Sequence, residues 1–175
     1  MNVNLIKQFR LVRIGIAVIL TMVLFVSTVS ISNAYVLSPG WKLPIHDNIG
    51  VYIPSDLSDV TIKSNVNKWD TYTGRVSFSF SAISAQIKFL DNRSLDNGTY
   101  ATTFLRSGAN KDIIIYKSFK SLSTVRKNET IVHEAGHALG LGHSDKTTTS
   151  VMRATGFNDK AYPLSDDIAG IKALY

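Results

Sequence analysis

The chain of 175 residues contains no cysteine and very little glutamate or histidine. The absence of cysteine excludes disulfide bonds, thiolate metal ligands and thiol nucleophiles, so the fold must depend on packing and on other metal ligands. The only glutamates are Glu129 and Glu134, and there are four histidines. Three of these histidines and Glu134 nevertheless lie within the eleven positions 133–143. Such a concentration of rare residues marks this segment as the candidate functional site.

A basic surface suited to nucleic acid is also missing. The formal net charge is +6, but Lys7, Arg10 and Arg13 lie in the first thirteen residues. From Tyr35 onward, 16 Lys and Arg face all 13 Asp and Glu, which leaves a net charge of +3. No basic cluster interleaved with aromatic residues occurs in that part of the chain. We therefore expect no nucleic-acid partner.

The first 34 residues have the three parts of a secretory signal peptide. The basic residues precede an uncharged apolar run, IGIAVILTMVLFV (14–26), and the more polar STVSISNA (27–34) ends in a small-x-Ala pattern. An uncleaved membrane anchor is the alternative, because weaker apolar character extends over residues 14–31, the short end for a membrane span. In either case we expect residues 35–175 to be exported, secreted or anchored facing outside. An exported chain without cysteine indicates a bacterial source.

Residues 35–175 have the length of one domain in which strands and helices are mixed. Residues 41–54 are strand-like, and alternating or β-branched runs predict further strands. A helix is expected over 55–74, capped by Ser55 or Asp56 and ended by Gly74. We predict further strands at 76–83, 85–91, 99–106 and 112–119, and helices at 124–139 and 165–175, the last capped by Ser165.

The segment HEAGHALGLGH (133–143) has the spacing of a zinc site. His133 and His137 are four residues apart, so on a helix both imidazoles lie on one face and can share one ion. Gly140 can turn the chain sharply out of that helix, which allows His143 to return to the same ion. Three histidines leave the fourth position of a tetrahedral zinc ion for water, as in catalytic sites.

Glu134 is the candidate general base. It follows the first histidine directly and is not needed as a ligand, so it is suited to deprotonate a zinc-activated water. The alternative is a helix with incidental histidines. A lone HExxH would be a weak signal, whereas the extended HExxHxxGxxH is a strong one. We therefore predict one catalytic zinc ion, held by His133, His137 and His143.

The motif resembles that of the metzincin zinc metallopeptidases, and specifically that of the matrixins. SVM (150–152) is similar to their Met-turn, in which Met152 would form a hydrophobic floor beneath the metal, and LSDDIAGIKALY (164–175) resembles their closing helix. The resemblance implies an α+β, zincin-like fold: a twisted, mostly parallel five-stranded sheet with three helices and a cleft across the zinc. It also implies that residues 99–106 form an antiparallel edge strand that binds substrate backbone.

Three departures from the family pattern matter. His46 is the only other histidine, so the second, structural zinc site of animal matrixins cannot be built. Asp91 and Asp96 are candidate calcium ligands, although acidic residues in turns usually hydrogen-bond their own backbone. Ala154 stands where astacin-like relatives have a tyrosine. Arg153 and Ala154 replace the Tyr-Pro that follows the Met-turn methionine in the family, which leaves the shape of the specificity pocket open.

Together these observations predict a secreted, monomeric zinc endopeptidase that acts on proteins or peptides. The domain boundaries are 1–34 for the signal peptide or anchor and 35–175 for the catalytic domain. The alternative is a catalytically inactive metal-binding adhesin or interaction protein with the same fold, against which the intact Glu134 argues. Only YVLSPG lies between Ala34 and Trp41, and no cysteine is available to block the metal, so we expect no inactive precursor.

Overall fold

The computed structural model describes residues 35–81, 84–106, 109–146 and 148–175. The predicted signal peptide or anchor, residues 1–34, therefore lies outside the described residues. Among the helices of the described ranges, none combines the length and the apolar character that a membrane crossing requires.

Five strands form one sheet in the order β2-β1-β3-β5-β4. β1 is parallel to β2 and β3, β3 is parallel to β5, and β4 is antiparallel to β5 at the edge of the sheet. The strands are β1 (Ile49–Tyr52), β2 (Phe78–Phe80), β3 (Ile87–Asn92), β4 (Ala101–Leu105) and β5 (Lys111–Tyr116). This confirms the predicted mostly parallel five-stranded sheet, including the antiparallel edge strand within residues 99–106.

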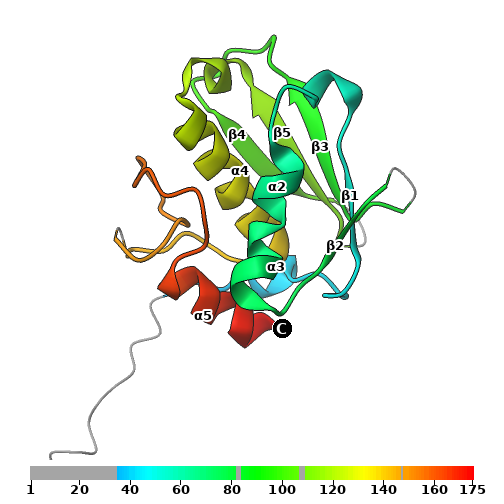
Figure 1. Ribbon diagram of the computed structural model, residues 1–175, viewed down its shortest axis with the longest axis vertical. Helices are drawn as coiled ribbons and strands as arrows, with labels where there is room; N and C mark the ends of the chain where they lie inside the picture. Colours follow the sequence, from blue (N-terminus) through cyan, green and yellow to red (C-terminus); the bar gives the residue numbers. More distant parts are fainter. Residues whose placement is uncertain (1–34, 82–83, 107–108, 147) are drawn as a thin grey trace, which may run out of the picture. The chain divides into compact units, whose positions relative to one another are not determined.

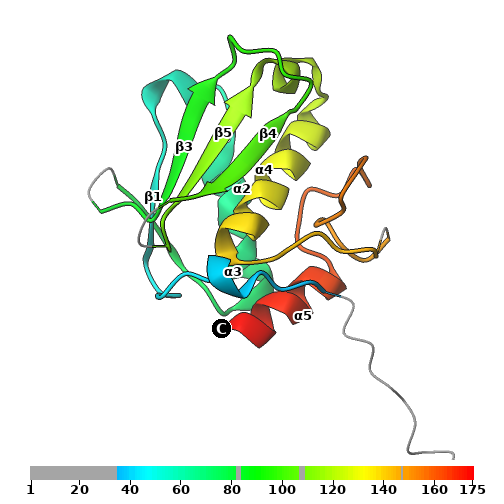
Figure 2. The same ribbon diagram turned by 180° about the vertical axis from the view of Figure 1, so that it is seen from behind.

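The helices are collected on one side of the sheet. Figures 1 and 2 show α2, α3 and α4 on the same face, with α5 beneath them near the end of α3. α4 packs against β4 and β5, and α5 packs against α3. The helices are α2 (Ile62–Val66), α3 (Lys68–Thr73), α4 (Thr124–Leu139) and α5 (Ser165–Leu174), with short 3-10 turns η1 (Pro39–Trp41), η2 (Ser55–Leu57) and η4 (Lys117–Ser121).

The helix predicted over residues 55–74 starts later and is interrupted. Residues 55–57 form η2, α2 begins only at Ile62, and Asn67 separates α2 from α3. The buried Leu57 anchors η2 in the core, while the Asp59 carboxylate is held by Arg93 from the loop after β3. These long-range contacts fix residues 55–61 outside the helix, so the prediction that Ser55 or Asp56 caps it was wrong. The predicted end at Gly74 is confirmed.

Four other predictions about where elements begin or end differ from the structure. Ser165 is the first residue of α5 rather than its cap. The N-cap is Leu164, whose backbone N–H donates to the carboxylate of Asp167 at 2.8 Å. The strand predicted over 112–119 ends at Tyr116, because the chain turns into η4 to bury Phe119. Within 41–54 only β1 is a strand, and the predicted 76–83 strand shortens to β2, with residues 82–83 outside the described part.

The core lies between the sheet and α4. Alternate residues of the central strands point toward the helices, so β3 buries Ile87 and Phe89 while Lys88 between them stays half-exposed. From the other side, the fully buried Trp69 of α3 packs into this layer, and its Nε1–H donates to the carbonyl oxygen of Val132 at 3.0 Å. This hydrogen bond ties α3 to the middle of α4, and so helps to fix the helix that carries the metal motif.

Candidate metal centre and cleft

α4 carries the first two predicted ligands on its last two turns. One side of this helix is buried in the core through Ile131, Val132, Ala135, Ala138 and Leu139. His133 and His137 lie four residues apart, and their rings meet edge-on with centroids 4.6 Å apart. The predicted helix and its shared imidazole face are therefore both present.

At the end of α4 the chain reverses direction, which brings His143 back toward His133 and His137. Gly140 has a φ of 107°, a left-handed conformation that costs a residue with a side chain considerably more. The N–H of Leu141 then bonds back to the carbonyl of Gly136 at 3.0 Å. This reversal brings the His143 ring to centroid distances of 4.7 Å from His137 and 5.4 Å from His133.

Backbone carbonyls fix the tautomers of the two helical histidines. Nδ1 of His133 lies 2.8 Å from the carbonyl oxygen of Val151, and Nδ1 of His137 lies 2.8 Å from that of Leu141. A carbonyl can only accept, so each Nδ1 must carry the proton. The Nε2 lone pairs of both rings are thereby left for a metal ion, and the carbonyl contacts hold the rings in place.

Burial keeps these imidazoles neutral. Burial, with a smaller contribution from the neighbouring histidines, lowers the pKa of His133 and of His137 to about 4, below the ordinary value of 6.5. Because only a neutral imidazole binds a metal ion, both groups are in the binding form at neutral pH without having to lose a proton.

The three histidines fit a small tetrahedral ion. Among the described residues, they form the group whose ligand atoms could hold a metal, with those atoms all within 4.8 Å of one another. Nε2 of His137 lies 3.1 Å from Nε2 of His143. Ligand nitrogens about 2.0–2.1 Å from a tetrahedral zinc ion stand roughly 3.3 Å apart, so this spacing suits zinc.

Glu134 lies beside these ligands but outside their group. Its side chain is only 6% exposed, and the hydroxyl of Thr103 on β4 donates to its Oε2 at 2.6 Å. Burial raises the pKa of the Glu134 carboxyl, and the nearby His137 ring and the Thr103 hydrogen bond oppose that rise. Glu134 therefore reaches the cleft as a desolvated carboxyl group next to the metal-binding point.

Two hollows meet at Glu134. The larger, about 590 Å³, lies along β4 and is bounded by Trp41, Ala101, Thr103, His137 and His143 among others. The second, about 490 Å³, lies between the start of β4, α4 and the segment after the Met-turn, and its walls include Glu129, His133, Arg153, Ala154 and Phe157. Arg153 and Ala154, which depart from the family pattern, therefore shape the second hollow directly.

Met152 lies where the Met-turn requires it. Its side chain is buried against the last turns of α4, and a Cβ built on Gly136 would come within 2.4 Å of its Sδ. Only glycine at this position allows the methionine and the helix to approach so closely. Met152 therefore packs against the segment between Glu134 and His137, while its role as a floor beneath the metal stays a prediction.

The Met-turn is held from below by a buried carboxylate on α5. Asp167, which is 1% exposed, accepts hydrogen bonds from the Ser150 hydroxyl and from the backbone N–H groups of Val151 and Leu164. On the preceding residue, Asp166 accepts from the Ser144 hydroxyl at 2.6 Å, directly after His143. The sequence places this acidic pair in the first turn of the last helix, which gives no signal that it supports the site.

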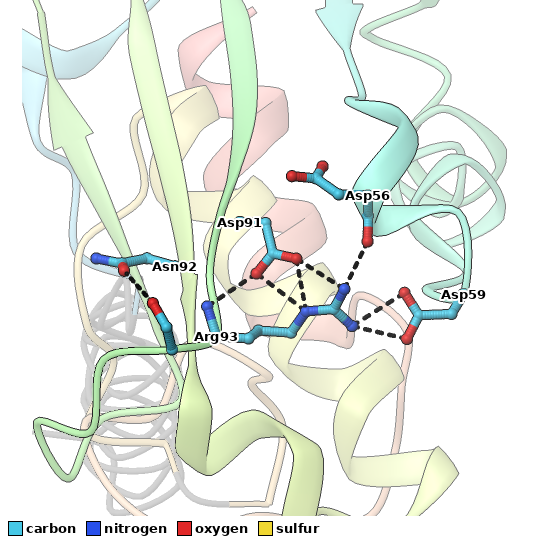
Figure 3. Close-up of polar contacts among 6 residues, drawn as sticks. Asp56, Asp59, Asp91, Asn92 and Arg93 are labelled. Carbon is cyan, nitrogen blue, oxygen red and sulfur yellow. Dashed lines mark hydrogen bonds and ion pairs between the residues drawn. The ribbon is translucent and has the colours of Figure 1, made fainter.

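The remaining candidates lie elsewhere. His46 is exposed in a separate hollow with Asp47, Asp70 and Tyr175. The Asp91 carboxylate is bound by the guanidinium of Arg93, which also reaches Asp59 and the backbone of η2 (Figure 3). Asp96 accepts from the Ser118 hydroxyl and faces Lys117 at 3.5 Å. Both candidate calcium ligands thus have cationic partners, and they belong to no group able to hold a metal among the described residues.

Comparison with known proteins agrees with this geometry. The family model of the matrixins matches residues 53–175. One structure of myroilysin is similar with a TM-score of 0.55 at 15% identity, over 79% of this chain and 97% of that one. A second structure of myroilysin has a TM-score of 0.56 at 17% identity, over 77% of this chain and 86% of that one. The GM1-bound form of the ECX AB5 holotoxin matches with a TM-score of 0.51 at 16% identity, over 72% of this chain and 79% of that one. No curated protein sequence matches significantly.

At these identities the structural likeness shows the shared fold, whereas the family model identifies the family. Its match covers more than half of the chain and includes the three histidines, the Met-turn and α5. The chain therefore belongs to the matrixins, a family of zinc-dependent metallopeptidases.

Proposed function

We propose that the chain is a secreted zinc endopeptidase that cleaves peptide bonds in proteins or peptides. The observation that carries this proposal is the convergence of three imidazoles on one point beside the Glu134 carboxyl, at the meeting of two hollows. Secretion is inferred from the signal-like pattern of residues 1–34 alone. All groups that the reaction needs come from one chain, so the proposal requires only a monomer.

His133, His137 and His143 would hold the zinc ion. When bound, zinc supplies a Lewis acid that polarises the scissile carbonyl and lowers the pKa of water toward about 7. The chain contributes the orientation of the ligands, because Val151 and Leu141 hold the rings of His133 and His137 through their Nδ1 protons. The donor set contains three histidines and no carboxylate, which leaves Glu134 available for proton transfer.

Glu134 would act first as a base and then as an acid. Its carboxylate takes a proton from the attacking water and later delivers it to the leaving amine. Burial raises the pKa of this carboxyl, which brings it closer to neutral pH and so suits a group that must both accept and release a proton. A protein that merely bound a metal would have no use for a desolvated carboxyl group at this position.

The free edge of β4 would bind the substrate as an added strand. Tyr116 N–H bonds to the Tyr100 carbonyl at 2.9 Å, and Arg106 N–H bonds to the Asn110 carbonyl at 2.7 Å. Hydrogen-bonded positions alternate in an antiparallel pair, so the backbone groups of residues 101, 103 and 105 point away from β5. An extended peptide can pair with these groups along the larger hollow.

Calcium is not part of the proposal. The two carboxylates considered for it, Asp91 and Asp96, are engaged by Arg93 and by Lys117 with Ser118. The Arg93 cluster serves instead to join the end of β3 to η2 and the loop before α2 (Figure 3).

The first prediction concerns the metal. We expect one zinc ion per chain, lost in His137→Ala, because two imidazoles cannot replace a three-ligand site. Zinc should raise the melting temperature of the wild-type protein but not that of the variant, since only the folded site binds it. The control is His46→Ala, which removes the histidine outside the group. Zinc analysis measures the metal content, and thermal unfolding measures the change in melting temperature on adding zinc. One zinc per chain in His137→Ala would contradict the ligand assignment.

The second prediction concerns Glu134→Gln. Loss of the general base should lower kcat by about a hundredfold to ten-thousandfold. Zinc content should stay near one per chain, because Glu134 is not a ligand. The matched control is Asp70→Asn, which removes an exposed carboxyl group on α3 that lines neither hollow at Glu134. A Glu134→Gln variant with kcat close to that of the wild type would refute the assigned base.

The third prediction concerns the substrate edge. Ala101→Pro removes an outward N–H without removing a hydrogen bond to β5, so it should raise KM about two- to tenfold while zinc content stays near one per chain. Phe104→Ala is the control, because this side chain is exposed and does not line either hollow at Glu134. An unchanged KM for extended peptides in Ala101→Pro would place substrate binding elsewhere.

A further inference from the structure

Thr103 joins the edge strand to Glu134 through one buried hydrogen bond. Its hydroxyl lies 2.6 Å from Oε2 of Glu134 and 3.0 Å from the backbone carbonyl oxygen of the same residue. A hydroxyl has a single proton, and the carboxylate is both the nearer and the more strongly charged acceptor. The hydroxyl is therefore placed to donate to the carboxylate.

The position of Thr103 in β4 directs its side chain toward Glu134 on α4. Side chains alternate along a strand, so Ala101 and Thr103 are buried toward α4, whereas Phe104 is exposed on the other side. The backbone N–H and carbonyl of Thr103 meanwhile point away from β5, toward the free edge. One residue thus presents its backbone to the cleft and its hydroxyl to the base.

The contact also restricts the motion of Glu134. A β-branched side chain on a strand has few χ1 rotamers, so the Thr103 hydroxyl is held in place by its own backbone. In the described part of the chain, no other side chain donates a hydrogen bond to the Glu134 carboxylate. The direction of this carboxylate therefore depends on Thr103 together with the surrounding packing.

We propose that Thr103 is a positioning residue for the general base. Its hydroxyl holds Oε2 of Glu134, so that the carboxylate keeps one orientation at the cleft and its other oxygen exchanges the proton with water and leaving group. This inference rests on the proposed peptidase function. The Thr103 side chain contacts neither the metal nor the reacting atoms, and it affects the reaction only through Glu134. Misplacing a catalytic group by about 1 Å can cost on the order of a hundredfold in rate.

The test compares variants of the full chain that keep or lose the hydroxyl. Thr103→Val has the same shape without the hydroxyl and should lower kcat about ten- to a hundredfold. KM should change less than about twofold, because the backbone that pairs with substrate remains. Thr103→Ser keeps the hydroxyl and should recover most of the lost kcat. Zinc content should stay near one per chain in both variants. If Thr103→Val does not fold, Thr103→Ala removes the same hydroxyl with a smaller side chain.

Two controls separate positioning from simple stabilisation. Thr73→Val removes another buried hydroxyl, one that bonds to the backbone carbonyl of Trp69 away from the cleft, and should lower the melting temperature without lowering kcat. In the Glu134→Gln background, Thr103→Val should cause little further loss, because the carboxylate that it positions is already gone. A purely structural role, with the hydroxyl bonded to the Glu134 carbonyl, would cost the same factor in both backgrounds.

The outcomes are distinct. If Thr103→Val and Thr103→Ala keep the wild-type kcat, or if their loss is undiminished in Glu134→Gln, the positioning role is wrong while the peptidase function stands. If the zinc-loaded wild-type chain cleaves no member of a mixed peptide library, the peptidase function is wrong and the positioning role is overturned with it. A kcat loss restored by serine and absent in the Glu134→Gln background supports the proposal.

Discussion

The site depends on the buried carboxylate of Asp167, which links α5 to the Met-turn. It accepts from Leu164 N–H at the start of α5 and from Ser150 and Val151 in the Met-turn. The carbonyl of that same Val151 accepts the Nδ1 proton of His133. A buried carboxylate without these donors would cost far more free energy than one that is fully hydrogen-bonded, so α5, the Met-turn and the metal helix are fixed together.

α4 faces the apolar core on one side and the cleft on the other, and its residue pattern matches both. One side is apolar and completes the core, while His133, Glu134 and His137 bring polar groups into a poorly hydrated cleft. Such groups reduce stability unless they have partners. The histidines find them in backbone carbonyls, and Glu134 finds one in Thr103. The zinc proposed here would complete the partners of the imidazoles, so metal binding and folding would support each other.

Local patterns predicted much of this arrangement, whereas contacts between distant segments were not visible in the sequence. The spacing of His133 and His137 and the glycine at 140 correctly indicated α4, its end and the three-histidine group, because each follows from helix geometry. The β-branched and aromatic character of residues 99–106 correctly indicated a strand, and the family resemblance correctly placed it at the edge. By contrast, the late start of α2 and the roles of Thr103 and Asp167 depend on partners more than fifteen residues away. A threonine in a β-branched strand carries no signal of which side chain it will meet.

The central claim is that the reversal at Gly140 assembles one zinc site from three imidazoles, with Glu134 left free for proton transfer. X-ray absorption spectroscopy at the zinc edge of the metal-loaded protein tests this most directly, because it reports the kind, number and distance of the ligand atoms. The account predicts three histidine nitrogens at about 2.0–2.1 Å and one oxygen from solvent, with the same spectrum in Glu134→Gln. Two histidine nitrogens, or an oxygen ligand that disappears in Glu134→Gln, would contradict it.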